Sequence, residues 1–308
     1  MLRSILVPLD GSEFSERSLP LAGEVARASG AAVHLAHVHV PKEPEHLIGT
    51  AGLPYESVDV AGYEQRQLRR EREYLHSVER EFDGNGTVVD STILEGESVV
   101  DELASYARRV DSDMIFLTSH AYAGLRRAWL GSTMEGVLRK TSAPILVIHP
   151  PREALDAEPL TSFRHILVPL DGSPLAESVL LPAADLARAT GARVTLLSVL
   201  NEPVLLGPTI QPVTPDLGSA DRDFAVDYLE RVADDLRGEG LAVTVETRRG
   251  NSVSRTITVV ARDLEADLIA MATHGRSGLR RTLAGSVADM VLHTIDVPLL
   301  LVRPPFLA

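Results

Sequence analysis

Short apolar runs alternate along the chain with longer segments in which apolar residues recur every three or four positions. The runs "SILVPLD" at 4–10 and "DLIAMAT" at 267–273 are apolar and end at turn residues, which predicts buried strands. The segments 98–110 and 252–264 have helical spacing. This alternation predicts an α/β protein with parallel strands, right-handed crossovers and helices on both faces of the sheet.

The pattern occurs twice along the chain. "ILVPLDGS" occurs at 5–12 and at 166–173, and later segments of the two copies match at a shorter offset. In each copy a single helix is expected after the first strand, capped by Ser12 or Ser173 and, in the first copy, ended by Gly30. We therefore expect two tandem doubly wound domains, 1–150 and 163–308, joined by a linker at 151–162 that is rich in Pro and acidic residues.

Composition narrows the classes of partner and compartment. The 308 residues include no Cys, which excludes disulfides, thiolate metal sites and a cysteine nucleophile, and suits a reducing cytosol. The formal net charge of −13 repels nucleic-acid backbones, so no nucleic-acid partner is expected. The first residues do not resemble a signal peptide, and no apolar stretch reaches the roughly 18 residues that span a membrane. We therefore expect a cytoplasmic protein with no membrane partner.

Candidate chemistry gathers where the predicted strands end, which is where open parallel sheets bind ligands. Asp10 and Asp171 follow the first strand of each copy, and Val38 and Val199 lie near the end of the second. A loop after the fourth strand leads into a helix that begins near 131–132 or 285–286. Helix N-termini of this kind favour phosphate, and a carboxylate nearby can accept hydrogen bonds from a ribose. Together these features predict a nucleotide site.

At this point the sequence resembles a known family. "ILVPLDGS" and "THGRSGLRRTLAGS", followed by "VPLLLVRPP", are similar to the universal stress protein family over nearly the whole chain. The resemblance implies an adenine nucleotide α-hydrolase-like fold, with five parallel strands in the order 3-2-1-4-5 in each domain. Nucleotide-binding members of the family carry Gly, two residues, Gly, nine residues, Gly and then Ser or Thr.

This motif is better kept in the second copy. Ala272 stands at the first glycine there and Gly275 at the second, whereas the first copy has Thr118 and Ala121 at these positions. A Cβ at such a place blocks close approach of a phosphate or a positive φ. The resemblance therefore implies that ATP or AMP, with or without Mg²⁺, binds chiefly in the second domain.

The resemblance also implies the roles of the site residues. Asp171 would face the ribose and the backbone of Val199 the adenine. The phosphates would lie against Gly275, Arg276, Gly285 and Ser286. The candidates in the second domain are Pro169, Asp171, Val199, Met271, Thr273, His274, Gly275, Arg276, Gly285, Ser286 and Val287. The weaker candidates in the first domain are Pro8, Asp10, Val38, His120, Gly131, Ser132 and Thr133.

Several alternatives stay open from the residues themselves. Asp10 and Asp171 could cap turns, and the Gly-Ser pairs at 131–132 and 285–286 could simply begin helices. His120 and His274 could cap their loops. The histidines at 34, 37 and 39 could hold a metal ion, although no second group of ligands is evident and no metal site is expected. The arginines that follow Leu125 and Leu279 could assist phosphates, but a solvated helix face is the more ordinary interpretation.

Two expectations concern function and assembly. The leading hypothesis is a stress-response protein in which the nucleotide is a ligand or signal, and not an enzyme, with slow ATP hydrolysis left open. The alternative is an interaction or assembly module that binds no nucleotide. The short apolar strands Ile145–Ile148 and Leu299–Val302 are expected at sheet edges, which tend to recruit another strand. We predict that they pair antiparallel within the chain, while a homodimer of whole chains stays open.

Overall fold

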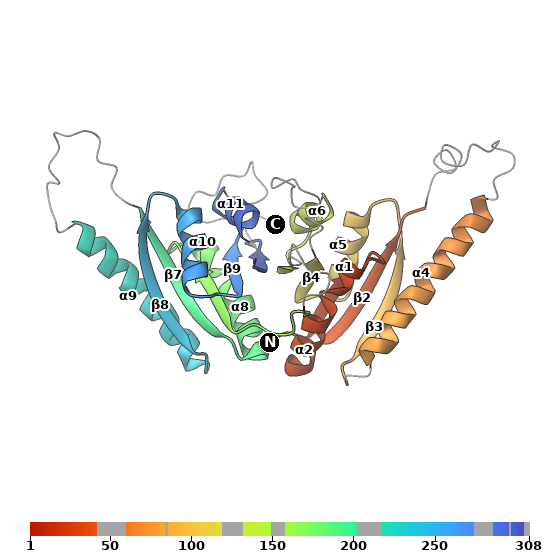
Figure 1. The fold of residues 1–308 in the computed structure, drawn as a ribbon, viewed down its shortest axis with the longest axis horizontal. Helices are drawn as coiled ribbons and strands as arrows, with labels where there is room; N and C mark the ends of the chain where they lie inside the picture. The colour runs from red at the N-terminus through yellow and green to blue at the C-terminus, as the bar shows by residue number, and fades with distance from the viewer. Residues whose placement is uncertain are drawn as a thin grey trace.

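A computed structural model describes residues 1–41, 60–83, 86–118, 132–148, 158–201, 217–273, 286–295 and 297–304. These residues form one continuous ten-stranded sheet with helices on both faces (Figure 1). The strands of the first half are β1 (Ser4–Pro8), β2 (Ala32–His39), β3 (Val89–Glu95), β4 (Met114–Thr118) and β5 (Ile145–Ile148). Those of the second half are β6 (His165–Pro169), β7 (Arg193–Asn201), β8 (Val243–Gly250), β9 (Leu268–Ala272) and β10 (Leu299–Val302).

The strand order confirms the predicted topology. Across the whole sheet it runs β3-β2-β1-β4-β5-β10-β9-β6-β7-β8, so each half has the order 3-2-1-4-5. Every pairing inside a half is parallel, and β5 and β10 pair antiparallel. The two predicted sheets are therefore one mixed sheet, joined at its centre.

The helices alternate with the strands as expected. In the first half they are α1 (Glu13–Glu16), α2 (Leu19–Ser29), α4 (Val60–Asp83), α5 (Val99–Arg109) and α6 (Ser132–Lys140). In the second half they are α7 (Pro174–Glu177), α8 (Leu180–Thr190), α9 (Leu217–Gly238), α10 (Val253–Asp263) and α11 (Ser286–Thr294). None of the helices in the described ranges combines the length and apolar character that a bilayer crossing requires.

The prediction of a single helix after β1 and β6 was wrong. Each segment instead forms one turn, α1 or α7, and then a separate helix, α2 or α8. Pro20 and Pro182 lie near the starts of these second helices. A proline ring clashes with the carbonyl four residues earlier and supplies no N–H, so a continuous helix would be broken there. The predicted caps are confirmed, because Ser12 and Ser173 accept from the backbone N–H three residues on and Gly30 is left-handed.

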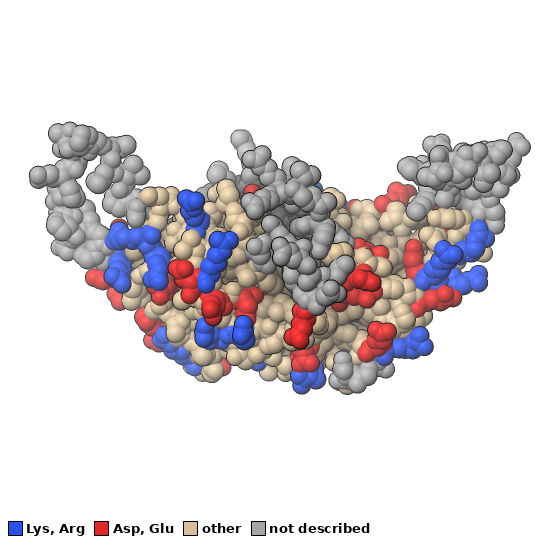
Figure 2. All heavy atoms as spheres, viewed as in Figure 1, with Lys and Arg blue, Asp and Glu red and all other residues tan. Residues whose placement is uncertain are grey.

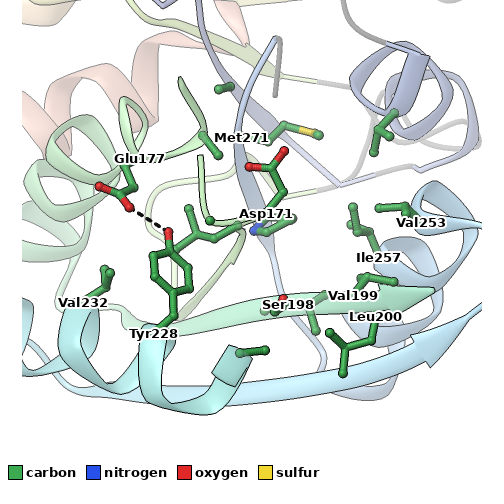
Figure 3. Close-up of a pocket in the computed structure, with 18 of the residues that line it drawn as sticks. Asp171, Glu177, Ser198, Val199, Leu200, Tyr228, Val232, Val253, Ile257 and Met271 are labelled. Carbon is green, nitrogen blue, oxygen red and sulfur yellow. Dashed lines mark hydrogen bonds between the residues drawn. The ribbon is translucent and has the colours of Figure 1, made fainter. Parts of the chain in front are cut away.

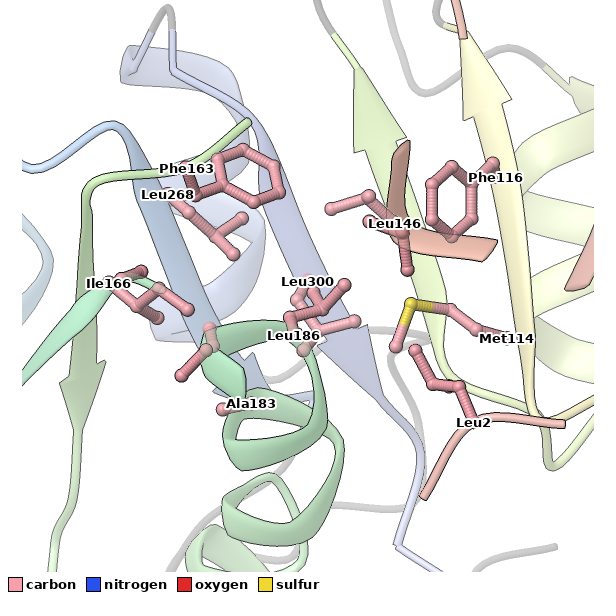
Figure 4. Packing of buried hydrophobic residues seen from close by; sticks show 14 of the residues in the cluster. Leu2, Met114, Phe116, Leu146, Phe163, Ile166, Ala183, Leu186, Leu268 and Leu300 are labelled. Carbon is pink, nitrogen blue, oxygen red and sulfur yellow. The ribbon is translucent and has the colours of Figure 1, made fainter. Parts of the chain in front are cut away.

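Two hydrophobic cores lie on opposite faces of the sheet. The helices α2, α4, α8 and α9 cover one face, and α5, α6, α10 and α11 cover the other. Each core runs through both halves, because Leu146 and Leu300 face one side whereas Val147 and Leu299 face the other. Figure 4 shows Leu146 and Leu300 packed between side chains of the two halves. The continuous sheet therefore makes a single folded unit out of the two repeats.

The junction of the two halves is the pairing of β5 with β10. The predicted antiparallel pairing is confirmed, with Leu299 opposite Val147, Leu300 opposite Leu146 and Leu301 opposite Ile145. Both strands are buried along their whole length. Helices α2 and α8 also pack against each other, and the amino terminus of Met1 lies 2.9 Å from the Asp185 carboxylate. The domain boundaries themselves stay a prediction, since most of the expected linker lies outside the described residues.

We predict that Leu300→Ala destabilises the whole chain by about 2–5 kcal/mol, because it opens a cavity in the core that both halves share. Leu181→Ala is the matched control, since Leu181 is 65% exposed on α8, and its effect should stay within about 0.5 kcal/mol. Urea unfolding of the two variants measures the difference. Equal stability of the two variants would contradict the shared core.

Candidate functional site

A cavity of about 1040 Å³ opens at the carboxyl ends of β6, β7 and β9 (Figure 3). It exists because neighbouring strands end at different heights. Pro169, the last residue of β6, lies beside Leu197, whereas β7 continues to Asn201. The sheet is therefore open beyond Pro169, and the walls of the opening come from the turn after β6, from the ends of β7 and β9, and from α9, α10 and α11.

Asp171 stands in the turn that leaves β6 and lines this cavity. Its Oδ1 accepts hydrogen bonds from the backbone N–H of Ser173 at 3.0 Å and from the Ser173 hydroxyl at 2.6 Å. The turn requires a left-handed residue at Gly172, with φ of 76°. The turn-capping role that the sequence left open is therefore confirmed. Asp171 is nevertheless exposed, and a carboxylate has acceptor sites for further hydrogen bonds.

Val199 presents its backbone to the cavity. The carbonyl of Leu197 accepts from the N–H of Leu170, so the backbone of Leu197 faces β6. Backbone groups alternate in direction along a strand, so the N–H and C=O of Val199 face the same side as those of Leu197. On that side β6 has already ended. The N–H and C=O of Val199 therefore point into the opening as one donor and one acceptor. The resemblance implied that a purine would contact these groups.

The remaining described candidates come from β9 and α11. Met271 and Thr273 are buried at the end of β9, where the N–H of Thr273 donates to the carbonyl of Val302 at 2.8 Å. Ser286 and Val287 form the first turn of α11 and line the same cavity. The cavity therefore brings together seven predicted residues: Pro169, Asp171, Val199, Met271, Thr273, Ser286 and Val287. His274, Gly275, Arg276 and Gly285 lie outside the described residues.

The first half repeats part of this arrangement. Asp10 makes the same turn, accepting from the N–H of Ser12 at 3.0 Å, and the following Gly11 has a φ of 84°. Pro8 and Val38 are half-buried at the ends of β1 and β2. The remaining described candidates, Ser132 and Thr133, begin α6. His120 and Gly131 lie outside the described residues.

A tyrosine–glutamate pair that the sequence reasoning missed closes one side of the cavity. The hydroxyl of Tyr228, on α9, donates to Glu177 Oε1 at 2.9 Å (Figure 3). Burial raises the pKa of Tyr228, and the hydrogen bond and charge of Glu177 raise it further, so the phenol stays protonated and continues to donate. One signal could have found this pair, because both copies place a Glu six residues after the strand-end Asp.

The three histidines of the first half do not form one cluster. Side chains alternate between the faces of a strand, so His34 faces α5 whereas His37 and His39 face α4. His34 packs edge-on to Tyr106, and His37 packs edge-on to Tyr74. Within the described ranges, no group of three or more His, Cys, Asp or Glu is arranged to hold a metal ion.

The rims of the two halves differ in charge. Arg248 and Arg249 precede Gly250 at the end of β8, and Arg248 lies in register with Val199 of the cavity wall and pairs with Glu246. Arg255 lies in the first turn of α10, a helix that also lines the cavity. The corresponding positions of the first half are Leu94, Glu95 and Asp101. Figure 2 shows basic side chains gathered over the upper ends of β8 and α10.

Solved structures share this fold over almost the whole chain. A universal stress protein from Archaeoglobus fulgidus matches with a TM-score of 0.64 and 19% identity, covering 98% of this chain and 96% of that one. A crystal structure from Pseudomonas aeruginosa matches with a TM-score of 0.67 and 17% identity, covering 99% and 95%. These likenesses establish the architecture, including the tandem arrangement.

Sequence comparisons lead to the same family. A universal stress protein of Mycolicibacterium smegmatis is 26% identical over 97% of both chains. One from Mycobacterium tuberculosis H37Rv is 28% identical over 63% of this chain, and the match spans 62% of that relative's length. The model of the universal stress protein family matches twice, at residues 1–149 and 162–303. The chain therefore belongs to the universal stress protein family, as a member with two tandem family domains.

Proposed function

We propose that this protein is a cytoplasmic stress-response protein that binds one adenine nucleotide, ATP or AMP, chiefly in its second domain. The nucleotide acts as a ligand or signal and is not turned over rapidly. The observation that carries the proposal is the cavity beyond the end of β6, where Asp171, the backbone of Val199 and the start of α11 converge.

The residues that line this cavity fit such a ligand. The N–H and C=O of Val199 can pair with a purine edge, and the exposed Asp171 carboxylate can accept from ribose hydroxyls. The first turn of α11 offers backbone N–H groups and the positive end of a helix dipole to phosphates. Any Mg²⁺ would then accompany the phosphates of ATP.

Rim charge supports the choice of domain. Arg248 and Arg249 lie near the end of β8, next to β7 of the cavity wall, and Arg255 lies on α10, while Arg248 pairs with Glu246. At the matching positions of the first domain, the Glu95 carboxylate lies 3.8 Å from Arg72 and Asp101 pairs with Lys140. Charge at the rim of a cleft raises the local concentration of oppositely charged ligands. The second domain is therefore the better site for an anionic nucleotide.

The described part of the site favours retention of the nucleotide over its turnover. The described lining residues include neither His nor Cys. Two of the carboxylates, Asp171 and Glu177, already accept hydrogen bonds from protein groups. We therefore propose a binding protein and not an enzyme.

An assembly role that needs no nucleotide is the second candidate. The observation in its favour is the pairing of β5 with β10, which joins the two repeats through backbone hydrogen bonds and a shared core. The two candidates differ in what they expect of the purified protein when adenine nucleotides are added.

We predict one nucleotide-binding event per chain for ATP or AMP in calorimetry of the full-length protein. The physical reason is the asymmetry of the two domains in rim charge and in the glycine motif. The protein as purified is also expected to release adenine-absorbing material on denaturation. If neither nucleotide binds and nothing is released, the assembly candidate replaces this proposal.

We predict that Asp171→Ala lowers nucleotide affinity about tenfold to a hundredfold, the loss expected for a hydrogen bond to a charged group. Asp10→Ala is the matched control, because both residues cap the same turn. The two variants should lose similar stability in thermal melts, whereas only Asp171→Ala should weaken binding. Equal nucleotide affinity in both variants would show that Asp171 only caps its turn and does not contact the nucleotide.

We predict that Arg255→Gln weakens ATP binding a few-fold and makes its affinity less sensitive to salt, because a surface charge acts over a short, screened range. Arg164→Gln changes the net charge equally at the opposite end of β6 and is the control. Titrations at low and high salt measure both effects. An identical salt response in the two variants would show that the rim plays no part.

A further inference from the structure

The cavity of the second domain continues onto the face of the sheet that α9 covers. Along β7, Val199 belongs with the core under α10 and α11, so Ser198 and Leu200 point to the opposite face, towards α9. Both line the cavity, together with side chains of α9 (Figure 3). We call this part the α9 compartment, and its lining residues are Ser198, Leu200, Asp221, Phe224, Ala225, Tyr228, Arg231, Val232 and Asp235.

Apolar and aromatic side chains form part of the α9 compartment, beside the charged side chains of Asp221, Arg231 and Asp235. Phe224 lines the cavity although 72% of its surface is exposed. Leu200, Ala225 and Val232 supply aliphatic surface, and Tyr228 is held in place by its bond to Glu177. Sites for small molecules are built in this way, from apolar and aromatic walls with a few fixed polar groups. The compartment therefore suits an apolar group.

The first domain has the same backbone but fills the same space with its own side chains. The residues that correspond to Ser198 and Ala225 are His37 and Glu71. His37 is buried, with its Nδ1 2.9 Å from the carbonyl of Leu9 and its Nε2 3.8 Å from Glu71 Oε1. The second domain has the smaller Ser198 and Ala225 at these two positions, and both line its cavity.

A second histidine completes this filling. His39, which corresponds to Leu200, is buried with its Nδ1 2.7 Å from Glu71 Oε2 and its Nε2 3.0 Å from Glu64 Oε2. These contacts tie the end of β2 to α4 with hydrogen bonds. In the second domain the matching residues of α9 are Ala225 and Gly218, which carry no side-chain hydrogen-bonding group. The two domains therefore share a backbone arrangement and differ in the side chains that occupy it.

Asp171 lies where the α9 compartment meets the rest of the cavity. Asp171 and Tyr228 both line the cavity. Asp171 is also the residue proposed above to contact the ribose. Because Tyr228 and Phe224 line the same cavity as Asp171, a group attached to the ribose has space on the side of α9. The cavity, at about 1040 Å³, is at the upper end of the roughly 300–1,000 Å³ usual for such sites.

We propose that the second domain binds an adenine nucleotide that carries an apolar group on its ribose, with that group in the α9 compartment. This proposal rests on the proposed function and adds the class of ligand. The nucleotide part is held as described above, and the compartment selects among nucleotides by the area of apolar surface that each can bury.

The test compares ATP with mant-ATP, which carries an aromatic N-methylanthraniloyl ester on its ribose. The full-length protein is expected to bind mant-ATP about tenfold more tightly than ATP. Ala225→Glu, which introduces the residue of the first domain, and Phe224→Ala, a change at an exposed position, should each bring the two affinities towards equality. Leu181→Ala, an exposed apolar residue elsewhere on the domain, should leave the preference intact.

The outcomes separate the two proposals. Equal affinities for ATP and mant-ATP in the unaltered protein, or a preference that both variants retain, would overturn the α9 compartment while leaving nucleotide binding in place. Failure of both nucleotides to bind would overturn the proposed function and this inference with it. A third outcome is that free methyl N-methylanthranilate binds together with ATP, without competition, while mant-ATP binds no more tightly than ATP. The compartment would then bind a small molecule separate from the nucleotide, and the proposal of a group on the ribose would be overturned.

Discussion

The antiparallel pairing of β5 with β10 is the contact on which the rest of the molecule depends. Each half alone would end in an apolar edge strand, β5 or β10. One row of backbone N–H and C=O groups on that strand would then have no neighbouring strand to pair with. Joined, the two strands satisfy these groups and extend both hydrophobic cores across the centre of the sheet. A strand is buried on both faces only when helices cover both faces. The pairing of β5 with β10 therefore also brings helices of the two halves together, and α2 packs against α8.

The site follows from the lengths of the strands. The central strand β6 ends at Pro169, while its neighbour β7 runs on to Asn201, so the backbone of β7 faces an opening where a partner strand would otherwise lie. The opening receives side chains from both faces of the sheet, because successive residues of β7 point in opposite directions. A single short strand thus creates a cavity that is lined by Asp171 and by both apolar and charged side chains of α9.

The two domains show how one backbone supports different chemistry. The turn at Asp10 repeats the turn at Asp171 bond for bond. Around these turns, however, the first domain buries His37 and His39 against glutamates of α4, where the second domain has small or aliphatic residues. The sequence near the clefts also differs, since Arg248, Arg249 and Arg255 stand where the first domain has Leu94, Glu95 and Asp101. Duplication has kept the scaffold and allowed the contents of the two clefts to diverge.

The sequence by itself determined the class of fold, the duplication, the order of elements and the residues at the strand ends. These follow from local patterns, since period-two and period-3.6 apolar spacing, turn residues and caps act over a few positions. It also predicted that Ile145–Ile148 and Leu299–Val302 would pair, because short apolar edges need a partner. Pattern alone did not show that Pro20 and Pro182 would divide the helix after the first strand.

Only the tertiary structure decided which side chains share the cavity. The pair formed by Tyr228 and Glu177 joins residues 51 positions apart, and the repeated Glu marks one partner in the sequence without showing what it contacts. The three histidines of the first domain looked like one group in sequence, yet the pleat sends His34 to the opposite face from the other two. The glutamates of α4 that meet His37 and His39 become their neighbours only when the helix packs on β2, since packing, and not sequence separation, sets which groups lie within hydrogen-bonding distance.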